Sequence, residues 1–337
     1  MPQVSIIVPC YNEQATIRLL LDALYAQTFV RLEMEVIIAD GMSTDSTRTE
    51  ISAWGVAHPD LTVRVVDNPK RAIPAALNAA LQTAQGDIIV RLDAHSMPAP
   101  DYVAKSVEVL RAGLGDNVGG VWQIQPGAAG WVARSIAVAA AHPLGVGGAQ
   151  YRVGGQPQAV DTVPFGAFHR NLVERIGFYD ETLLSNEDYE YNARIRKAGG
   201  VVWFDPRIRS TYFARSTFQD LARQYWRYGY WKFQMLRRYP ETIRWRQGLP
   251  PLFVLTVLLL ALLAIWSPWA FGALLAEIGL YAIVIGIVGL QGALKLRDAG
   301  LIIGLPIAIA VMHFSWGLAF LWSFSKTIFG KKNRSGV

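Results

Sequence analysis

The sequence is poor in charge and contains almost no cysteine. Of its 337 residues, 17% are charged, and Cys10 is the single cysteine. Soluble domains usually have about 25% charged residues, and one cysteine excludes both a disulfide framework and a zinc site built from cysteines. Hydrophobic residues make up 52% of the chain. This excludes an intrinsically disordered protein, because so apolar a chain can bury a large core.

The few charges are unevenly distributed. Residues 1–206 carry a net charge of −6, residues 207–248 carry +8 and residues 249–337 carry +4. The basic segment also contains many aromatic residues, a mixture that can stack on single-stranded nucleic acid. We do not expect a nucleic-acid partner, because the body of the chain is acidic. We interpret the segment instead as a helix that opens with a capping box at 216–219 and lies at a membrane interface.

Three long apolar runs follow the basic segment, at residues 249–271, 270–294 and 301–324. Glu277 is the only Asp, Glu, Lys or Arg in them. Each run approaches or exceeds the roughly 20 residues that a membrane-spanning helix needs. We therefore expect a transmembrane region of about three helices. The alternative, buried helices of a soluble domain, requires a larger protein core than this chain can supply.

The orientation in the membrane follows from two further features. The apolar stretch at residues 4–8 is too short for a signal peptide, so we expect the acidic body in the cytoplasm, and a multi-pass protein of the inner (plasma) membrane in contact with its lipids. The basic segment fits the cytoplasmic face. Three crossings would place Lys331, Lys332 and Arg334 outside. Either the basic segment at 207–248 determines the orientation in spite of this, or one apolar segment is re-entrant.

The acidic body alternates predicted strands with predicted helices. Strands are expected at 4–9, 35–40, 61–67 and 87–93, and helices at 13–27, from 44 onwards, at 73–84 and at 100–110. This order predicts an α/β domain with a mostly parallel, Rossmann-like sheet. We expect the catalytic domain over residues 1–215, basic amphipathic interfacial helices over 216–248 and the transmembrane region over 249–330.

Polar residues follow three of the predicted strands. The first strand ends at residues 9–13, the second at Asp40 and the fourth at Asp93 and His95. Ligands bind beyond the carboxyl ends of the strands in such sheets, so these loops can converge on one site. Each acidic residue taken alone is equally typical of a helix cap or a turn.

Two acidic motifs carry possible chemistry. Asp93 and His95 alternate along an extended segment and can face one cation, Mg²⁺ or Mn²⁺. Residues 186–196 begin a predicted helix whose first turn is acidic, and a carboxylate at a helix N-terminus stays ionised, as a general base requires. The alternatives are a capping Asp beside a surface His, and an ordinary acidic first turn.

Taken in order, six segments resemble the family 2 glycosyltransferases, which have a GT-A fold. They are VSIIVPCYNE (4–13), IIADGMSTDST (37–47), GDIIVRLDAH (86–95), TVPFGAFHR (162–170), NEDYE (186–190) and QYWRY (224–228). The resemblance covers about residues 3–240 and is strongest to the succinoglycan and exopolysaccharide biosynthesis subgroup. The chain has D-x-H where many relatives have D-x-D, and Tyr228 where membrane members of the family have Trp.

The resemblance implies a role for particular residues. Asp188, with Glu187 beside it, corresponds to the catalytic base, and Asp93 and His95 to the site for Mn²⁺ or Mg²⁺. The other implied groups are the nucleotide-binding residues Pro9, Tyr11, Asn12, Glu13, Asp40, Arg71 and Asp93, the leaving-group residues Gln224, Arg227 and Tyr228, and the acceptor-side residues Phe165, Gly166 and Ala167.

The resemblance also implies an activity. It is the inverting transfer of a hexose from a nucleotide diphosphate sugar, expected to be a UDP-sugar, to a hydroxyl group of a polyprenyl-diphosphate-linked glycan in exopolysaccharide or cell-surface polysaccharide synthesis. Other polysaccharide-assembly proteins are possible partners. Three alternatives stay open: a polyprenyl-phosphate glycosyltransferase, a processive polysaccharide synthase, and a catalytically silent membrane scaffold that binds a nucleotide.

Overall fold

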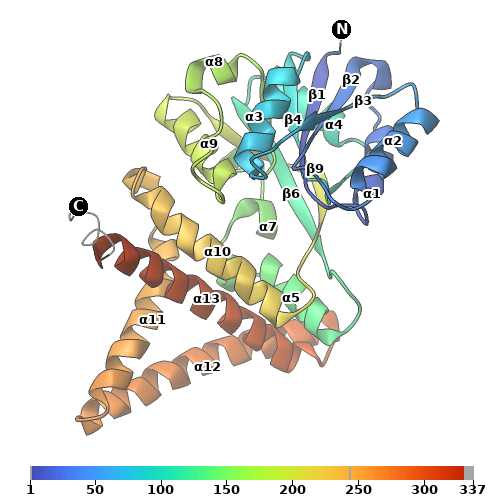
Figure 1. Ribbon diagram of the computed structural model, residues 1–337. Helices are drawn as coiled ribbons and strands as arrows, with labels where there is room; N and C mark the ends of the chain where they lie inside the picture. Colours follow the sequence, from blue (N-terminus) through green and yellow to red (C-terminus); the bar gives the residue numbers. More distant parts are fainter. Residues whose placement is uncertain (1, 243, 330–337) are drawn as a thin grey trace. The chain divides into compact units, whose positions relative to one another are not determined.

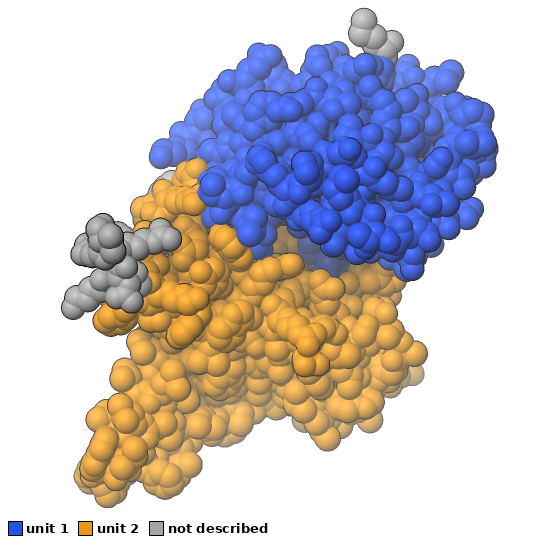
Figure 2. Space-filling view, in the orientation of Figure 1, with its two compact units in different colours: residues 1–123, 153–212 blue, residues 124–152, 213–337 orange. Residues whose placement is uncertain are grey.

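The computed structural model describes residues 2–242 and 244–329. The basic residues Lys331, Lys332 and Arg334, on which part of the predicted membrane orientation depends, lie outside the described residues. The chain divides into two compact units (Figure 2). One consists of residues 1–123 and 153–212, and the other of residues 124–152 and 213–337.

The first unit alternates strands and helices in the predicted order (Figure 1). Its elements are β1 (Val4–Cys10), α1 (Ile17–Tyr25), the 3₁₀ helix η1 (Arg31–Glu33), β2 (Met34–Asp40), α2 (Thr47–Ala57), β3 (Thr62–Asp67), α3 (Ile73–Thr83), β4 (Ile88–Arg91), β5 (Met97–Pro98), α4 (Tyr102–Arg111), β6 (Asn117–Gln125), β7 (Gln158–Ala159), β8 (Ala167–His169), α8 (Leu172–Ile176), α9 (Glu187–Lys197) and β9 (Val202–Phe213). The last residues of β6 and β9 belong to the second unit.

The strands form one sheet in the order β3-β2-β1-β4-β8-β6-β9-β5, with β7 paired to β9. β1 pairs in parallel with β2 and β4, and β2 in parallel with β3. These pairings confirm the predicted α/β domain. The remainder of the sheet is antiparallel, since β8 pairs with β4 and β6, and β9 pairs with β5 and β7. The sequence patterns do not predict this half.

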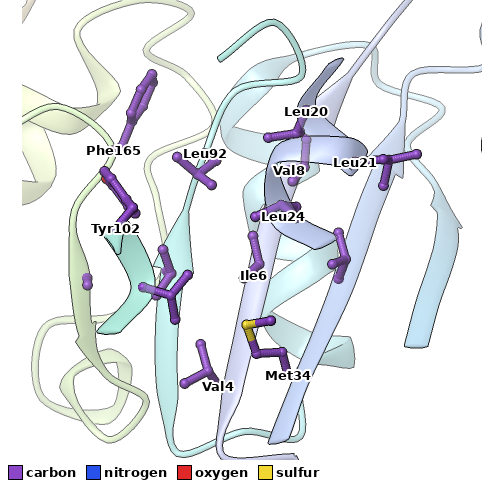
Figure 3. Close-up of a cluster of buried hydrophobic side chains, with 14 of the residues drawn as sticks. Val4, Ile6, Val8, Leu20, Leu21, Leu24, Met34, Leu92, Tyr102 and Phe165 are labelled. Atoms are coloured by element: carbon purple, nitrogen blue, oxygen red, sulfur yellow. The ribbon is translucent and has the colours of Figure 1, made fainter. Parts of the chain in front are cut away.

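The core of the first unit lies between the sheet and its helices. Alternate residues of β1, including Val4 and Ile6, point to one face, where they meet Leu20 and Leu24 of α1 (Figure 3). These leucines are buried because they recur at helical spacing along one side of α1. Helix α3 packs on β1, β2 and β3 with residues outside this cluster, so both faces of the parallel strands are covered.

The second unit is helical. It contains α5 (Trp131–Ala141), α6 (Pro143–Val146), α7 (Gln150–Val153), α10 (Phe218–Leu236), the 3₁₀ helix η2 (Pro240–Thr242), α11 (Trp245–Leu263), α12 (Pro268–Leu296) and α13 (Leu301–Phe329). Within the described residues, α11, α12 and α13 are the helices long and apolar enough to cross a membrane. They coincide with the three predicted apolar runs.

Helix α10 begins one residue later than predicted. The N-cap is Thr217, whose hydroxyl accepts a hydrogen bond of 3.1 Å from the backbone N–H of Asp220. The predicted box at 216–219 is therefore wrong by one position. The physical reason is that Thr217 has the extended backbone of a cap residue, with φ −127° and ψ 152°.

Gly120 lies in β6 where the sheet leaves no room for a side chain. A Cβ atom at this position would overlap the carbonyl group of Ile208 in β9. We predict that Gly120→Ala lowers the free energy of unfolding by at least about 3 kcal/mol, because the overlapping group is backbone and cannot move aside. The matched control is Gly55→Ala in α2, where a Cβ meets nothing within 4 Å and the midpoint should stay or rise. Thermal unfolding of the full chain in detergent measures both, and equal midpoints contradict the prediction.

Cys10, the last residue of β1, is 5% exposed. Burial, assisted by the negative charge of Asp40, raises the pKa of its thiol from an ordinary 9.0 to about 12. The thiolate is the reactive form, so the thiolate fraction at pH 8 falls by roughly a thousandfold. We predict that iodoacetamide modifies Cys10 much more slowly in the folded protein than in urea, with a rate that rises as the pH approaches 12. Intact-mass spectrometry measures the rate, and equal rates in the two states contradict the prediction.

Candidate functional site

The carboxyl ends of β1, β2 and β4 lie at the same edge of the sheet. Cys10 at the end of β1 is in register with Asp40 at the end of β2, and Ile7 of β1 is in register with Arg91 at the end of β4. The loops that follow these strands therefore converge, as the sequence predicts for a parallel sheet.

The loop after β1 is hydrogen-bonded to the loop after β2. The backbone N–H of Asn12 donates to Ser43 Oγ at 2.8 Å, and the backbone N–H of Thr44 donates to Asn12 Oδ1 at 2.8 Å. The backbone N–H of Glu13 donates to Thr47 Oγ1, also at 2.8 Å. Asn12 has a φ of 54°, a left-handed conformation that Asn tolerates better than most residues. The two loops thus form one continuous wall.

Asp40 is fully buried beneath this wall. Its Oδ2 accepts a hydrogen bond of 3.0 Å from the backbone N–H of Ser43 and pairs with Arg48 Nε at 2.6 Å. Arg48 also pairs with Asp67 at 2.5 Å. Hydrogen bonds to Asp67 and Asp40 hold the pKa of Arg48 above its usual value. The sequence analysis missed Ser43 and Arg48, although both lie within eight residues of Asp40.

The structure brings Tyr11 and Arg71 together. Tyr11 is 44% exposed, and the Arg71 guanidinium lies 5.6 Å from the centroid of its ring. This is the range of a cation–π contact. Arg71, a residue of the loop after β3, therefore joins the other predicted nucleotide-binding residues. Pro9 and Asp40 differ from them because they are buried residues of β1 and β2.

Arg91 is the centre of the second half of the site. Its side chain is 2% exposed, and its Nη2 lies 3.0 Å from Glu187 Oε1 and 3.2 Å from Asp93 Oδ1. Its Nη1 forms an ion pair with Asp188. One guanidinium thus joins the predicted cation ligand Asp93 to the two predicted catalytic carboxylates in the first turn of α9.

The electrostatics explain why a buried arginine is tolerated. Burial lowers the pKa of Arg91, but Asp93 and Glu187 raise it by more, so the net shift is upward and the group stays charged. An unpaired buried charge costs several kcal/mol, whereas a planar guanidinium with several carboxylate partners is compensated. The sequence analysis missed this residue. The signal was a single basic residue inside the apolar strand run IIVRL at 88–92.

His95 lies close to Glu13. Its Nδ1 is 2.9 Å from Glu13 Oε1. A carboxylate only accepts hydrogen bonds, so this contact places a proton on Nδ1 and, in the neutral ring, the lone pair on Nε2. A carboxylate that orients a histidine in this way is common around metal ions.

The side chains near Asp93 limit the kind of cation site that can form. The described residues contain no group of three or more His, Cys, Asp or Glu side chains that could hold a metal ion. Mg²⁺ is often bound by one or two carboxylates, with substrate phosphates completing the coordination. Asp93, with His95 as a second contact, fits a site of that kind and does not fit a cation held by protein alone.

The predicted acceptor-side residues lie beside Arg91. Phe165 and Gly166 both have left-handed backbones, with φ of 64° and 76°. The Gly166 carbonyl accepts a hydrogen bond of 3.0 Å from the Arg91 backbone, and the Phe165 ring centroid lies 5.9 Å from the Arg91 guanidinium. The side chains of Phe165 and Ala167 belong to the hydrophobic core, so they pack against the site from beneath.

The three predicted leaving-group residues lie together on α10 in the second unit. Gln224 Nε2 donates to the Tyr228 hydroxyl at 3.0 Å, and the Arg227 guanidinium lies 5.9 Å from the Tyr228 ring centroid. Arg227 is exposed. Tyr228, which replaces the family's usual Trp, therefore keeps a hydrogen bond to Gln224.

The chain resembles known proteins over most of its length. The model of the family "Glycosyl transferase family 2" matches residues 5–177. The succinoglycan biosynthesis protein ExoA of Rhizobium meliloti is 32% identical, over 94% of this chain and 93% of its own length. A dolichyl N-acetyl-alpha-D-glucosaminyl phosphate 3-beta-D-2,3-diacetamido-2,3-dideoxy-beta-D-glucuronosyltransferase of Methanococcus voltae is 26% identical, over 92% and 93%.

Solved structures agree on the fold. The mannosyltransferase PcManGT of Pyrobaculum calidifontis, in complex with GDP-Man and Mn²⁺, superposes with a TM-score of 0.63 at 22% identity, covering 98% of this chain and 88% of its own. Residues 1–349 of TarS of S. aureus, in complex with UDP-GlcNAc, give a TM-score of 0.52 at 16% identity, with coverage of 99% and 93%. The predicted resemblance is confirmed, and the chain belongs to glycosyltransferase family 2, with a GT-A-like α/β fold.

Proposed function

We propose that the protein is an inverting glycosyltransferase that moves a sugar from a nucleotide diphosphate sugar to a hydroxyl group of a polyprenyl-diphosphate-linked glycan. The observation that carries the proposal is the cluster in which Arg91 binds Asp93, Glu187 and Asp188. The cluster places Asp93, the proposed carboxylate on the donor side, beside Glu187 and Asp188, the proposed bases on the acceptor side. The name of the R. meliloti relative supports a role in exopolysaccharide or a similar cell-surface glycan.

The wall formed by the loops after β1 and β2 would hold the nucleotide. Asp40, buried and bound to Ser43 and Arg48, would hold in place the loop that meets the base. Tyr11 and Arg71 would lie against the nucleotide from the other loop. Solved neighbours contain GDP-Man or UDP-GlcNAc, and we expect a UDP-sugar as the donor here.

Asp93, assisted by His95, would hold Mn²⁺ or Mg²⁺ against the diphosphate of the donor. When bound, the cation would neutralise negative charge on the leaving diphosphate. Glu13 would hold the His95 ring in place through the 2.9 Å contact with Nδ1.

Asp188 would act as the general base. Its side chain is 23% exposed, whereas that of Glu187 is 11% exposed, so Asp188 is the more accessible of the two carboxylates. It would take the proton of the acceptor hydroxyl while that oxygen forms a bond to the anomeric carbon. The bond from this carbon to the diphosphate oxygen breaks on the opposite face, which inverts the configuration. Gln224, Arg227 and Tyr228 would bind the departing diphosphate.

The helical unit suggests where the acceptor is met. Helix α10 is basic and the three helices after it are apolar, a combination that suits a lipid diphosphate at a membrane surface. We propose that the protein resides in the inner membrane with its catalytic domain in the cytoplasm, where other polysaccharide-assembly proteins would take over the product.

Replacement of the proposed base gives the first test of this function. We predict that the wild type with Mn²⁺ or Mg²⁺ transfers label from one of a panel of nucleotide sugars to lipid-linked acceptors. Asp188→Asn should lower kcat by about 100-fold or more, because a general base contributes at least that factor. Glu187→Gln changes the neighbouring and less exposed carboxylate and is the matched control. Its kcat should fall by a smaller factor.

Two outcomes would contradict parts of this proposal. A near-normal rate in Asp188→Asn would favour a lipid phosphate as the nucleophile, because a phosphate needs no base. No transfer by the wild type in any combination of donor and acceptor would remove the enzymatic proposal. The length of the labelled product separates a single transfer from a processive synthase.

Arg91 should act as a positioning residue through the carboxylates that it binds. We predict that Arg91→Lys lowers kcat about 10- to 100-fold, because lysine keeps the charge but loses the planar fork that reaches three carboxylates. In a protein that already carries Asp188→Asn, Arg91→Lys should lower kcat by a much smaller factor, because the two residues act through one contact. Full additivity of the two losses would contradict this role.

The matched control for Arg91 is Arg194 of α9. Arg194 binds Glu190 at 2.6 Å and backbone carbonyls, but none of the proposed catalytic carboxylates. We expect Arg194→Lys to shift the unfolding temperature about as much as Arg91→Lys while changing kcat by less than about threefold. Equal losses of kcat would show that Arg91 supports only the stability of the domain.

A further inference from the structure

We propose that only α11 and α12 enter the hydrocarbon of the membrane, as a hairpin, and that α13 lies along the membrane interface together with α10. All three helices are long enough to span a bilayer. Their surroundings within the second unit are nevertheless different, and that difference carries the inference. It does not depend on the proposed activity.

Burial separates α13 from the other two apolar helices. In the most apolar 18-residue window of each helix, 11% of the residues of α11 and of α12 are buried, but 44% of those of α13. Helices α11 and α12 therefore expose apolar side chains on nearly all sides, as a lipid-inserted pair would. Helix α13 has one face covered by α10 and α5, and it also packs on α11 and α12.

Helix α10 covers that face along most of α13. Gly229 lies so close to α13 that a Cβ atom would clash with the backbone of Trp316, and Gln234 Nε2 donates to Ser323 Oγ at 2.8 Å. The contact positions increase together along the two helices, so α10 and α13 run parallel and side by side (Figure 1).

The beginning of α13 is covered by α5. Gly304 lies against Ser135, where a Cβ atom would clash, and Arg134 pairs with Asp298, just before α13, at 2.6 Å. The covered face of α13 thus has polar neighbours near its two ends, Ser135 at the start and Gln234 towards the end. A helix that crosses the bilayer would carry these neighbours into the hydrocarbon.

The charges of α10 forbid such a position. The exposed Arg223 and Arg227 lie in its first half and at its middle, and the exposed Arg237 and Arg238 directly follow its last residue, Leu236. A helix of 19 residues is about 28 Å long, close to the roughly 30 Å thickness of the hydrocarbon. Each charge at its centre costs about 3 kcal/mol or more. Helix α10 must lie at the interface, and α13 beside it must lie at nearly the same depth.

The free face of α13 is apolar. Ile303, Ile307, Leu318 and Trp322 are 64%, 38%, 38% and 49% exposed. These residues recur at helical spacing, so they form a stripe that a lipid surface can cover. The occupant of this stripe is therefore the acyl-chain boundary of the bilayer, with the arginines of α10 available for anionic headgroups.

The α11–α12 hairpin has its own internal contacts. Phe253 stacks on Tyr281 with ring centroids 4.5 Å apart, and Thr256 Oγ1 donates to Glu277 Oε1 at 2.5 Å. This hydrogen bond gives a partner to Glu277, the acidic side chain of the two helices, as insertion in lipid requires. Trp266 and Trp269 at the turn are 74% and 91% exposed.

The consequence concerns the side on which the chain ends. A hairpin enters and returns, so the end of α13 lies on the same side of the membrane as the start of α11. Three crossings would place it on the opposite side. The hairpin arrangement agrees with the positive-inside rule, because Lys326 in the last turn of α13 then shares a side with the basic segment.

Cysteine accessibility tests this arrangement in the full-length chain, since its single native Cys10 is buried. Four exposed positions receive a cysteine one at a time: Val56→Cys in α2, Ile265→Cys at the hairpin turn, Ala299→Cys between α12 and α13, and Lys326→Cys near the end of α13. A membrane-impermeant maleimide is added to sealed vesicles of either orientation. The wild-type chain measures the background from Cys10, and SDS shows that every added cysteine can react.

We expect Val56→Cys, Ala299→Cys and Lys326→Cys to be labelled from one and the same side, and Ile265→Cys not to be labelled from that side. Labelling of Lys326→Cys only from the side opposite to Val56→Cys would overturn the proposal. Labelling of Ile265→Cys from the side of Val56→Cys would also overturn it, because the hairpin would then not be inserted.

The depth of α13 gives an independent measurement. Nitroxide labels at Ile303→Cys and Leu318→Cys should report nearly equal depths in vesicles that contain an anionic lipid, measured from collisions with oxygen and a nickel chelate. In a helix that crosses the bilayer, these positions would differ in depth by about 20 Å, from 15 residues at 1.5 Å each. A difference of that size would overturn the proposal even if every labelled variant were folded.

Discussion

The first unit depends on the ion pairs of Arg91. This buried guanidinium connects the end of β4 to the first turn of α9, about a hundred residues further along the chain. Arg91 pairs with Asp93, Glu187 and Asp188 at once, and three carboxylates alone would repel one another. A charge of this kind is retained against a large desolvation cost. Its position at a strand end, where ligands bind in such sheets, is what makes the cluster a candidate for catalysis.

The parallel strands could be predicted because their residues obey a local rule. Short apolar runs that end in polar residues, separated by helical spacing, specify β1, β2 and β4 and the edge at which their loops meet. The acidic start of α9 and the pairing of Glu190 with Arg194 also follow from positions that are close in sequence. The same rule predicts that Asp93 and His95, which follow β4, lie at this edge of the sheet.

The remaining features depend on contacts between distant residues. β8 has three residues, and β6 contains two glycines, so neither shows a clear strand pattern, and their antiparallel pairing has no local signal. Arg91 is a single basic residue in an apolar strand, and nothing nearby in the sequence identifies its partners. The beginning of α10 differed by one residue because Ser216 and Thr217 are equally good caps by residue type, and only the backbone conformation distinguishes them.

The two units are stabilised in their nonpolar surroundings in different ways. In the first unit, charged groups enter the interior in compensated sets, as at Arg91 and at Asp40 with Arg48. In the second unit, helices approach each other through small residues: Gly229 lies against Trp316, and Gly317 lies against Pro250. Close packing of this kind needs no charge, so an apolar helix such as α13 can be held at the side of a basic one. Hydropathy alone therefore finds three equivalent helices, whereas packing distinguishes a lipid-exposed pair from a helix that is half covered by protein.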